Sequence, residues 1–135
     1  MSLEIKRRER EGITVLDLKG RITAGDEATA FRAAFEEATA QPEARLLLNM
    51  GEVDYIDSTG LGALVMCSKR ATNAKGVAKL VNVNRRAIEL LVMTRIDTLF
   101  EVFTDEIDAV NSFFPDREIK RFDILSFVQQ HQEEE

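Results

Sequence analysis

The sequence contains few of the side chains that build disulfides, metal sites or acid–base catalysts. Its 135 residues include one cysteine, one histidine, two prolines and no tryptophan. Because Cys67 stands alone, an internal disulfide is impossible, and a cysteine-based metal site is not expected. Cys67 lies in an apolar segment and is predicted to be a small core residue. The only histidine, His131, lies in a polar stretch near the C-terminus, and we expect no chemical role for it.

Long apolar runs are also missing. No segment approaches the ~18 apolar residues of a membrane span, and the charged N-terminal residues 4–11 fit neither a signal peptide nor a transit peptide. We therefore expect a cytoplasmic protein without a membrane span. The net charge is −6, with basic residues scattered among acidic ones, which argues against direct binding to nucleic acid. The hydrophobic fraction of 44% and charged fraction of 31% are typical of one globular domain with a real core.

Hydrophobic periodicity predicts alternating strands and helices. Strands are expected at 5–8, 13–18, 44–50, 78–83 and 99–103, and helices at 26–40, 58–73, after Asn84 and at 106–114. Glu11 and Gly12 would form a hairpin turn, residues 20–25 a loop, and Asp26 and Asn84 helix caps. The strand–helix–strand order implies parallel central strands. The predicted fold class is therefore α/β, a mixed β-sheet of about five strands with about four helices packed on it.

Pro115 is expected to end the last helix and to separate a domain at 1–114 from a C-terminal extension at 115–135. The extension is too apolar for a solvated tail up to Val128, whereas residues 129–135 are polar. Its apolar residues are Ile119, Phe122, Ile124, Leu125, Phe127 and Val128. We expect an additional element that packs on the body of the domain or on a second copy of the chain, as a homodimer would allow.

The most informative segment is residues 57–64, DSTGLGAL, which follows a buried strand and opens a helix. Asp57 or Ser58 would be the N-cap, accepting hydrogen bonds from amides of the first turn. Gly60 and Gly62 each cost the helix about 0.8–1 kcal/mol relative to alanine, so their presence in the opening turn needs a reason. Close approach of another surface is the reason we favour, and tight packing of the helix on its own sheet is the alternative.

The longer segment 53–64, VDYIDSTGLGAL, together with a Gly-Arg-Ile sequence at 20–22, resembles the STAS domain of bacterial anti-sigma-factor antagonists. The resemblance covers roughly residues 4–114. It implies a non-enzymatic protein that binds an anti-sigma factor which is also a serine kinase. That kinase would phosphorylate the first hydroxyl residue of the motif, here Ser58 rather than Thr59, and a metal-dependent serine phosphatase would reverse the reaction. The partner-binding residues would be Thr23, Asp26, Asp57, Ser58, Thr59, Gly60, Leu61 and Gly62.

The physical argument for Ser58 does not depend on the family. A phosphate there adds about 1.5–2 negative charges at pH 7 beside Asp57, on a surface that a partner must desolvate. Docking should weaken, while the amides and dipole of the helix N-terminus let the modified protein stay folded. The alternative interpretation is that Ser58 serves only in capping the helix.

STAS domains also occur on lipid and sulfate transporters and in stress-signalling scaffolds, where the same helix would dock without phosphorylation.

Two positions depart from the family pattern. The loop near the acceptor serine usually carries an acid, whereas this chain has Thr23, and its nearest acid is Asp26. Where the family often has Thr-Gly-Leu, this chain has Thr94, Arg95 and Ile96, which alters the turn before the last strand.

Enzyme interpretations find little support in the sequence. A serine hydrolase would need a histidine as the base for Ser58, and the sequence has none near it. A dinucleotide-binding loop at residues 60–65 lacks its third glycine and the acid at the end of the next strand. Asp54 and Asp57 have no second cluster that would make them a metal site or a glycosidase pair. No cofactor and no metal are expected.

Overall fold

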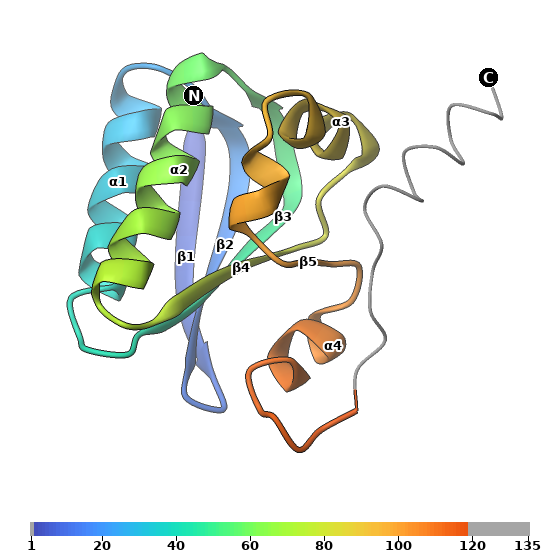
Figure 1. Cartoon of the computed structure of the whole chain (residues 1–135). Helices are drawn as coiled ribbons and strands as arrows, with labels where there is room; N and C mark the ends of the chain where they lie inside the picture. Colours follow the sequence, from blue (N-terminus) through green and yellow to red (C-terminus); the bar gives the residue numbers. More distant parts are fainter. Residues whose placement is uncertain (1, 119–135) are drawn as a thin grey trace, which may run out of the picture.

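The computed structural model describes residues 2–118, and these form one sheet with helices on both faces (Figure 1). In chain order the elements are β1 (Leu3–Arg10), β2 (Ile13–Ile22), α1 (Asp26–Ala38), β3 (Arg45–Ile56), α2 (Ser58–Asn73), β4 (Val77–Val81), α3 (Arg85–Met93), the 3-10 helix η1 (Ile96–Leu99), β5 (Val102–Phe103) and α4 (Glu106–Asn111). The five strands and four α-helices of the described chain confirm the predicted α/β class.

The strands lie in the sheet in the order of the sequence, β1-β2-β3-β4-β5. The β1–β2 pair is antiparallel, and its turn consists of Glu11 and Gly12, whose φ angles of 51° and 81° are typical of a tight hairpin. The pairs β2–β3, β3–β4 and β4–β5 are parallel, as the strand–helix–strand order predicted. The result is a mixed sheet with an antiparallel edge.

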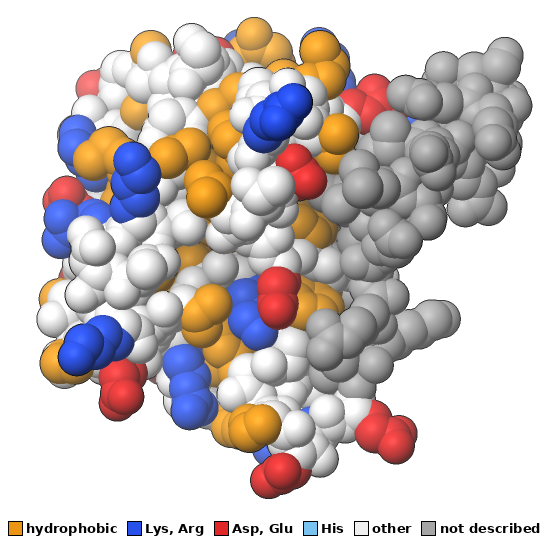
Figure 2. All heavy atoms as spheres, in the orientation of Figure 1, with side chains coloured by type: hydrophobic (Ala, Val, Ile, Leu, Met, Phe, Trp, Pro, Cys, Tyr) orange, Lys and Arg blue, Asp and Glu red, His pale blue; other side chains and the backbone are white. Residues whose placement is uncertain are grey.

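Both faces of the central strands are buried because successive side chains point to opposite sides of the sheet. On one side, Leu46 and Leu48 of β3 pack in the main core, under α1, α2, α3 and η1. On the other side, Leu47 packs in a smaller core that α4 covers through Ala109 and Val110. In the space-filling view of the molecule, apolar side chains show between the helices and charged ones over their outer surfaces (Figure 2).

Aromatic residues pack in both cores. Phe31, Phe35, Phe100 and Phe103 are buried, and the first two make an edge-to-face contact at 5.1 Å between ring centroids. Phe113 and Phe114 are half-buried and pack against the smaller core. Cys67 is fully buried in the main core, as predicted, and burial raises the pKa of its thiol to about 12.

Several predicted boundaries were wrong because tertiary pairing lengthens strands beyond their apolar runs. The strand predicted at 44–50 continues to Ile56, and β2 continues to Ile22, so that the predicted loop shrinks to residues 23–25. The parallel ladder between β2 and β3 holds these polar extensions and includes the pair Ile22↔Ile56.

Other boundaries near the helices also differ from the prediction. Asp26 does not cap α1: the N-cap position is Gly25, with φ of 96° and no side-chain cap, and Asp26 is the first helical residue. The last helix ends at Asn111 rather than Phe114. The last strand contains only Val102 and Phe103, because residues 96–99 form the 3-10 helix. Asn84 does cap α3, accepting a hydrogen bond from the amide of Ala87, as predicted.

A polar network fastens α4 to the sheet across the smaller core. The Arg8 guanidinium donates to both carboxylate oxygens of Asp17, at 2.7 and 3.0 Å, and to both of Glu106, at 2.9 and 2.6 Å. Arg10 donates to the Glu106 carboxylate as well, and Asn49 donates to Asp17. Because Glu106 is the first residue of α4, these contacts set where that helix lies.

Two further sequence predictions concern the C-terminal extension and membrane-spanning helices. The extension predicted at 115–135 lies mostly outside the described residues, which end at Glu118. No helix of the described chain is both long and apolar enough to cross a membrane.

Candidate functional site

The candidate site begins where β3 ends and α2 starts, at Asp57. Its backbone is extended, with φ of −96° and ψ of −176°, and its carboxylate accepts a hydrogen bond from the amide of Gly60 at 2.8 Å. Asp57 is therefore the N-cap of α2, one of the two residues that the sequence proposed for that role. Ser58 is the first residue of the helix proper.

The second oxygen of the Asp57 carboxylate reaches another segment of the chain. It accepts a hydrogen bond from the amide of Ala24 at 2.9 Å, in the short loop between β2 and α1. The backbone follows the same path, because the amide of Asp57 donates to the carbonyl of Ile22 at 3.3 Å. One carboxylate thus joins the start of α2 to the 23–25 loop.

The electrostatics of Asp57 follow from these bonds. Its pKa is lowered, first by the Ala24 amide and then by the Gly60 amide, because both donate to the charged form. The carboxylate is therefore ionised at neutral pH, and it lies beside the positive end of the α2 dipole.

The two hydroxyl residues of the motif are open to solvent. Ser58 and Thr59 are both exposed, so that neither side chain is walled off from an approaching donor. Ser58 adjoins the Asp57 carboxylate at the N-terminus of α2, where the helix dipole favours an anion. The arrangement therefore offers an accessible nucleophilic hydroxyl next to a fixed negative charge.

The two glycines of the motif have different structural roles. A Cβ built on Gly60 would lie 2.0 Å from the carbonyl oxygen of Ile22 and 2.9 Å from the Cγ2 of Ile56. Gly60 is thus required by packing of α2 on its own sheet, which was the alternative to an external surface. Gly62 is exposed, and a Cβ there would meet nothing within 4 Å. Leu61 packs in the main core, with 9% of its surface exposed.

The structure brings the 23–25 loop to the site, together with an acid that sequence reasoning missed. Thr23 is partly buried, and its hydroxyl donates to the carboxylate of Glu27 at 3.1 Å. Asp26, expected to be the nearest acid, is exposed in the first turn of α1. The four-residue spacing of Thr23 and Glu27 was the only available signal for their contact. Nothing in the sequence marks Ala24, whose contribution is a backbone amide.

The family departure at residues 94–96 also has a clear structural form. Arg95 has φ of 62° and ψ of 20°, the left-handed conformation that glycine adopts most easily, and it precedes η1. The turn is therefore retained, with an arginine in a conformation that costs a side chain about 1–2 kcal/mol.

Comparisons with known proteins identify the family and the fold of the chain. The model of one family, described as the STAS domain, matches residues 4–109. No curated protein matches the chain.

Among solved structures, an anti-sigma factor antagonist from Mycobacterium paratuberculosis is similar at 19% identity, with 82% of this chain and 92% of that chain covered and a TM-score of 0.70. The Bacillus cell fate determinant SpoIIAA in its phosphorylated form is similar at 19% identity, with 80% and 98% covered and a TM-score of 0.60. The murine anion transporter Slc26a9 is similar at 19% identity, with 76% of this chain but 18% of that chain covered and a TM-score of 0.66. At these identities the likeness establishes the fold.

Proposed function

The chain belongs to the STAS domain family, and from this membership and the geometry of Ser58 we propose that it is an anti-sigma factor antagonist controlled by phosphorylation. With Ser58 unmodified, it binds an anti-sigma factor that is also a serine kinase, in the cytoplasm and without catalytic activity of its own. Phosphorylation of Ser58 releases the partner, and a metal-dependent serine phosphatase restores the binding form. Transcription that depends on the sigma factor follows this cycle.

One observation carries the proposal: Ser58 is exposed at the start of α2, directly after an N-cap carboxylate that is held by two backbone amides. The γ-phosphoryl group of ATP would pass to the Ser58 Oγ, whose proton goes to a base on the kinase while ADP leaves. The hydroxyl needs no rearrangement of the chain for this transfer, because it already faces solvent.

The phosphate would act on the partner rather than on the fold. It brings about 1.5–2 negative charges to a position beside the ionised Asp57, and burying unpaired like charges in an interface costs about 2–5 kcal/mol. Within the free protein, the dipole at the N-terminus of α2 offsets part of that charge. Loss of the complex with retention of the fold is what a switch requires. The phosphorylated form of the similar Bacillus protein supports this assignment.

The proposed docking surface consists of the exposed residues of the motif and the neighbouring loop. Ser58, Thr59 and Gly62 present the start of α2, while Thr23 and Asp26 lie on the loop and on the first turn of α1. Asp57 holds these two parts together. Gly60 and Leu61 support the surface from within, since both are buried.

A second candidate function is that of an accessory or scaffold domain, which docks through the same surface and is never phosphorylated. The structural likeness to a domain-sized part of the murine anion transporter favours it. In that case the N-terminus of α2 would serve only as an assembly surface.

The two functions are separated by a binding and phosphorylation experiment. The unmodified protein is used to capture its partner from a lysate of its own cells, and the captured kinase is incubated with the protein and ATP. Intact mass and peptide mapping should show one phosphate on Ser58. Ser58→Ala should bind as the wild type does and remain unmodified, whereas Ser58→Asp should bind at least about 30-fold more weakly, as expected for a loss of about 2 kcal/mol.

Thr59→Asp is the matched control, because it adds the same charge one residue further along α2. A position-specific switch predicts a smaller loss of binding for Thr59→Asp than for Ser58→Asp. If the captured partner binds both Ser58 variants as it binds the wild type, the phosphorylation switch is wrong. Stable capture without any phosphate would then favour the scaffold function.

A further inference from the structure

The C-terminal part of β3, residues 51–56, has one edge without a neighbouring strand in the described chain. The pairing of β3 with β4 ends at Asn49↔Val81, whereas its pairing with β2 on the other side continues to Ile56. The chain turns away from the sheet after β4 because Asn82 adopts the left-handed conformation, with φ of 61°. Within residues 2–118, the edge of β3 from residue 51 to 56 that faces away from β2 therefore has no neighbouring strand.

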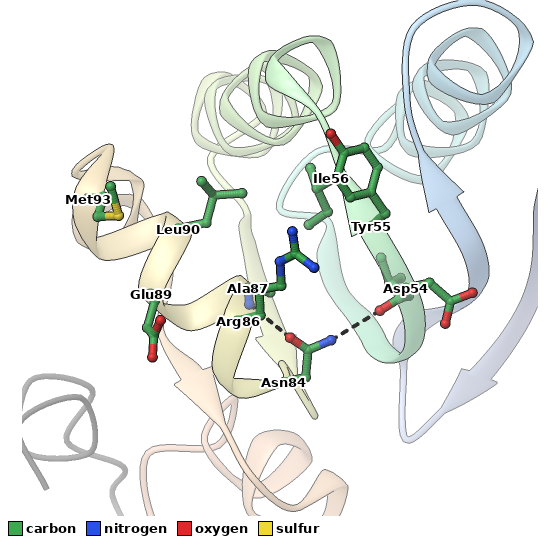
Figure 3. A pocket seen from close by; sticks show the side chains of 10 residues that line it. Asp54, Tyr55, Ile56, Asn84, Arg86, Ala87, Glu89, Leu90 and Met93 are labelled. Carbon is green, nitrogen blue, oxygen red and sulfur yellow. Dashed lines mark hydrogen bonds between the residues drawn. The ribbon is translucent and has the colours of Figure 1, made fainter. Parts of the chain in front are cut away.

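Helix α3 stands opposite this edge, and a groove of about 330 Å³ lies between them (Figure 3). The groove is lined by residues 53–56 of β3 and by Asn84, Arg86, Ala87, Glu89, Leu90 and Met93. The side-chain amide of Asn84 donates to the carbonyl of Val53 at 3.2 Å and so ties the start of α3 to the strand. Two of the exposed large apolar side chains of the described chain, Tyr55 at 45% and Met93 at 80%, line this groove.

Three charged residues, Asp54, Arg86 and Glu89, are among those that line the groove. Figure 3 shows Arg86 extending into the space between α3 and β3, while the carboxylates of Asp54 and Glu89 point away from it. In the described part of the chain, the Arg86 guanidinium has neither an ion pair nor a side-chain hydrogen bond, and the residue is exposed. An unpaired guanidinium between apolar walls is complementary to a carboxylate, which it can bind through two parallel hydrogen bonds.

We propose that this groove binds an extended peptide segment of a partner protein, which pairs with the edge of β3 beyond the Val53 carbonyl, already bonded to Asn84, and places a carboxylate on Arg86. Backbone hydrogen bonds from the strand edge supply affinity in this mode of recognition, and side-chain pockets supply specificity. Here an apolar side chain of the peptide packs against Tyr55, Leu90 and Met93. The carboxylate comes from an acidic side chain or from a peptide C-terminus.

Residues 53–56 of the groove lead along the chain into Asp57, the N-cap of α2. The proposal nevertheless stands without the phosphorylation switch. A strand edge and an arginine bind a peptide whatever the modification state of Ser58, and the test below uses no kinase.

The test uses the full chain and a random octapeptide display library. Selected peptides should share alternating apolar residues and an acidic position or free C-terminal carboxylate. One selected peptide, resynthesised with a fluorescent label, is then the probe for affinity, and hydrogen exchange locates its site. Binding should slow exchange of amides in residues 51–56. Peptides with an internal acid and an amidated C-terminus distinguish the two sources of the carboxylate.

Substitutions then test the role of Arg86. Arg86→Glu should weaken the probe by at least about tenfold and Arg86→Lys by only about threefold, because lysine keeps the charge but not the paired geometry. Lys69→Glu, an exposed position on α2, makes the same change in net charge and should leave the affinity unchanged.

Several results would overturn the proposal. One is a selected peptide whose binding leaves exchange at residues 51–56 unaltered, and another is equal affinity for the wild type and Arg86→Glu. Protection of these amides in the full chain without peptide would show that the chain itself occupies the groove. Protection that grows with protein concentration would identify a second copy as the occupant.

Discussion

The different environments of Gly60 and Gly62 predict opposite effects for the same substitution in the same helical turn. An alanine at Gly60 would place its Cβ 2.0 Å from the Ile22 carbonyl oxygen, whereas an alanine at Gly62 meets nothing within 4 Å. The close contact at Gly60 is with backbone in the β2–β3 ladder, which cannot rotate away as a flexible side chain can. To relieve it, α2 must move away from the sheet.

The expected magnitudes follow from two terms. Replacing glycine by alanine within a helix gains about 1 kcal/mol, and Gly62→Ala receives this gain without a penalty. Overpacking costs about 1–3 kcal/mol or more, and a contact this short belongs at the upper end. Gly60→Ala should therefore lower the free energy of unfolding by about 2 kcal/mol, and Gly62→Ala should raise it by about 0.5–1 kcal/mol.

The assay is equilibrium unfolding in urea, followed by circular dichroism. A difference of about 3 kcal/mol between the variants, with a urea dependence of about 1–3 kcal/mol per molar, separates their midpoints by at least about 1 M. Hydrogen exchange at the Gly60-position and Ala24 amides is a second readout, since both bind Asp57 in the wild type. Gly60→Ala should speed exchange at both, and Gly62→Ala at neither. If the two variants changed stability by the same amount and sign, the packing argument for Gly60 would be wrong.

Three further predictions concern positions outside the glycine pair. Because the folded-state pKa of Asp57 is lowered, its carboxylate contributes stability above its unfolded pKa, ordinarily about 3.9, and this contribution is lost as pH falls through the folded pKa. The difference in unfolding free energy between the wild type and Asp57→Asn, measured in urea from pH 7 to pH 2, should therefore shrink at the acidic end. A difference that stays constant with pH would contradict this cause. Arg8→Leu removes the hydrogen-bonded ion pairs with Asp17 and Glu106 and should lower the free energy of unfolding by about 1–2 kcal/mol, a range that allows for their partial exposure. Amide exchange in α4 should become faster, and unchanged exchange there would mean that these ion pairs do not hold the helix. Arg95→Gly relieves a left-handed backbone and should raise thermal stability by about 0.5–1 kcal/mol, whereas Arg95→Ala, which removes the same charge and keeps the strain, should not.

Part of the candidate site could be predicted from the sequence because some of its contacts join residues that are close in the chain. Asp57 and Asn84 each accept a hydrogen bond from an amide three residues further along the chain. The sequence predicts both bonds, because each residue is of a type that caps helices and precedes an apolar helical pattern. The exposure of Ser58 follows from its place in the first turn of the same helix. The cap predicted at Asp26 failed because residue type alone does not decide which residue takes the cap conformation, and Gly25 takes it here.

Contacts between distant segments could not be predicted in the same way. The bond from the Ala24 amide to Asp57 joins residues 33 positions apart, and the clamp from Arg8 to Glu106 joins residues 98 positions apart. The different roles of Gly60 and Gly62 depend on where Ile22 ends β2, and the free edge of β3 depends on where Asn82 leaves β4. The motifs that contain Asp57, Gly60, Gly62 and Ile22 do not specify which distant segment each residue contacts.

By itself, the sequence determined the alternation of strands and helices, the parallel central pairs, the burial of Cys67 and the start of α2 at Ser58. These features follow from periodicity and from hydrogen bonds between residues close in the chain, whose geometry is the same in any protein. Only the tertiary structure decided that Gly60 faces the sheet and Gly62 the solvent, that the Asp57 carboxylate joins the start of α2 to the 23–25 loop, and that α3 leaves a groove beside β3. Those features arise from packing between segments that are remote in sequence, because their contacts exist only once the whole sheet has assembled.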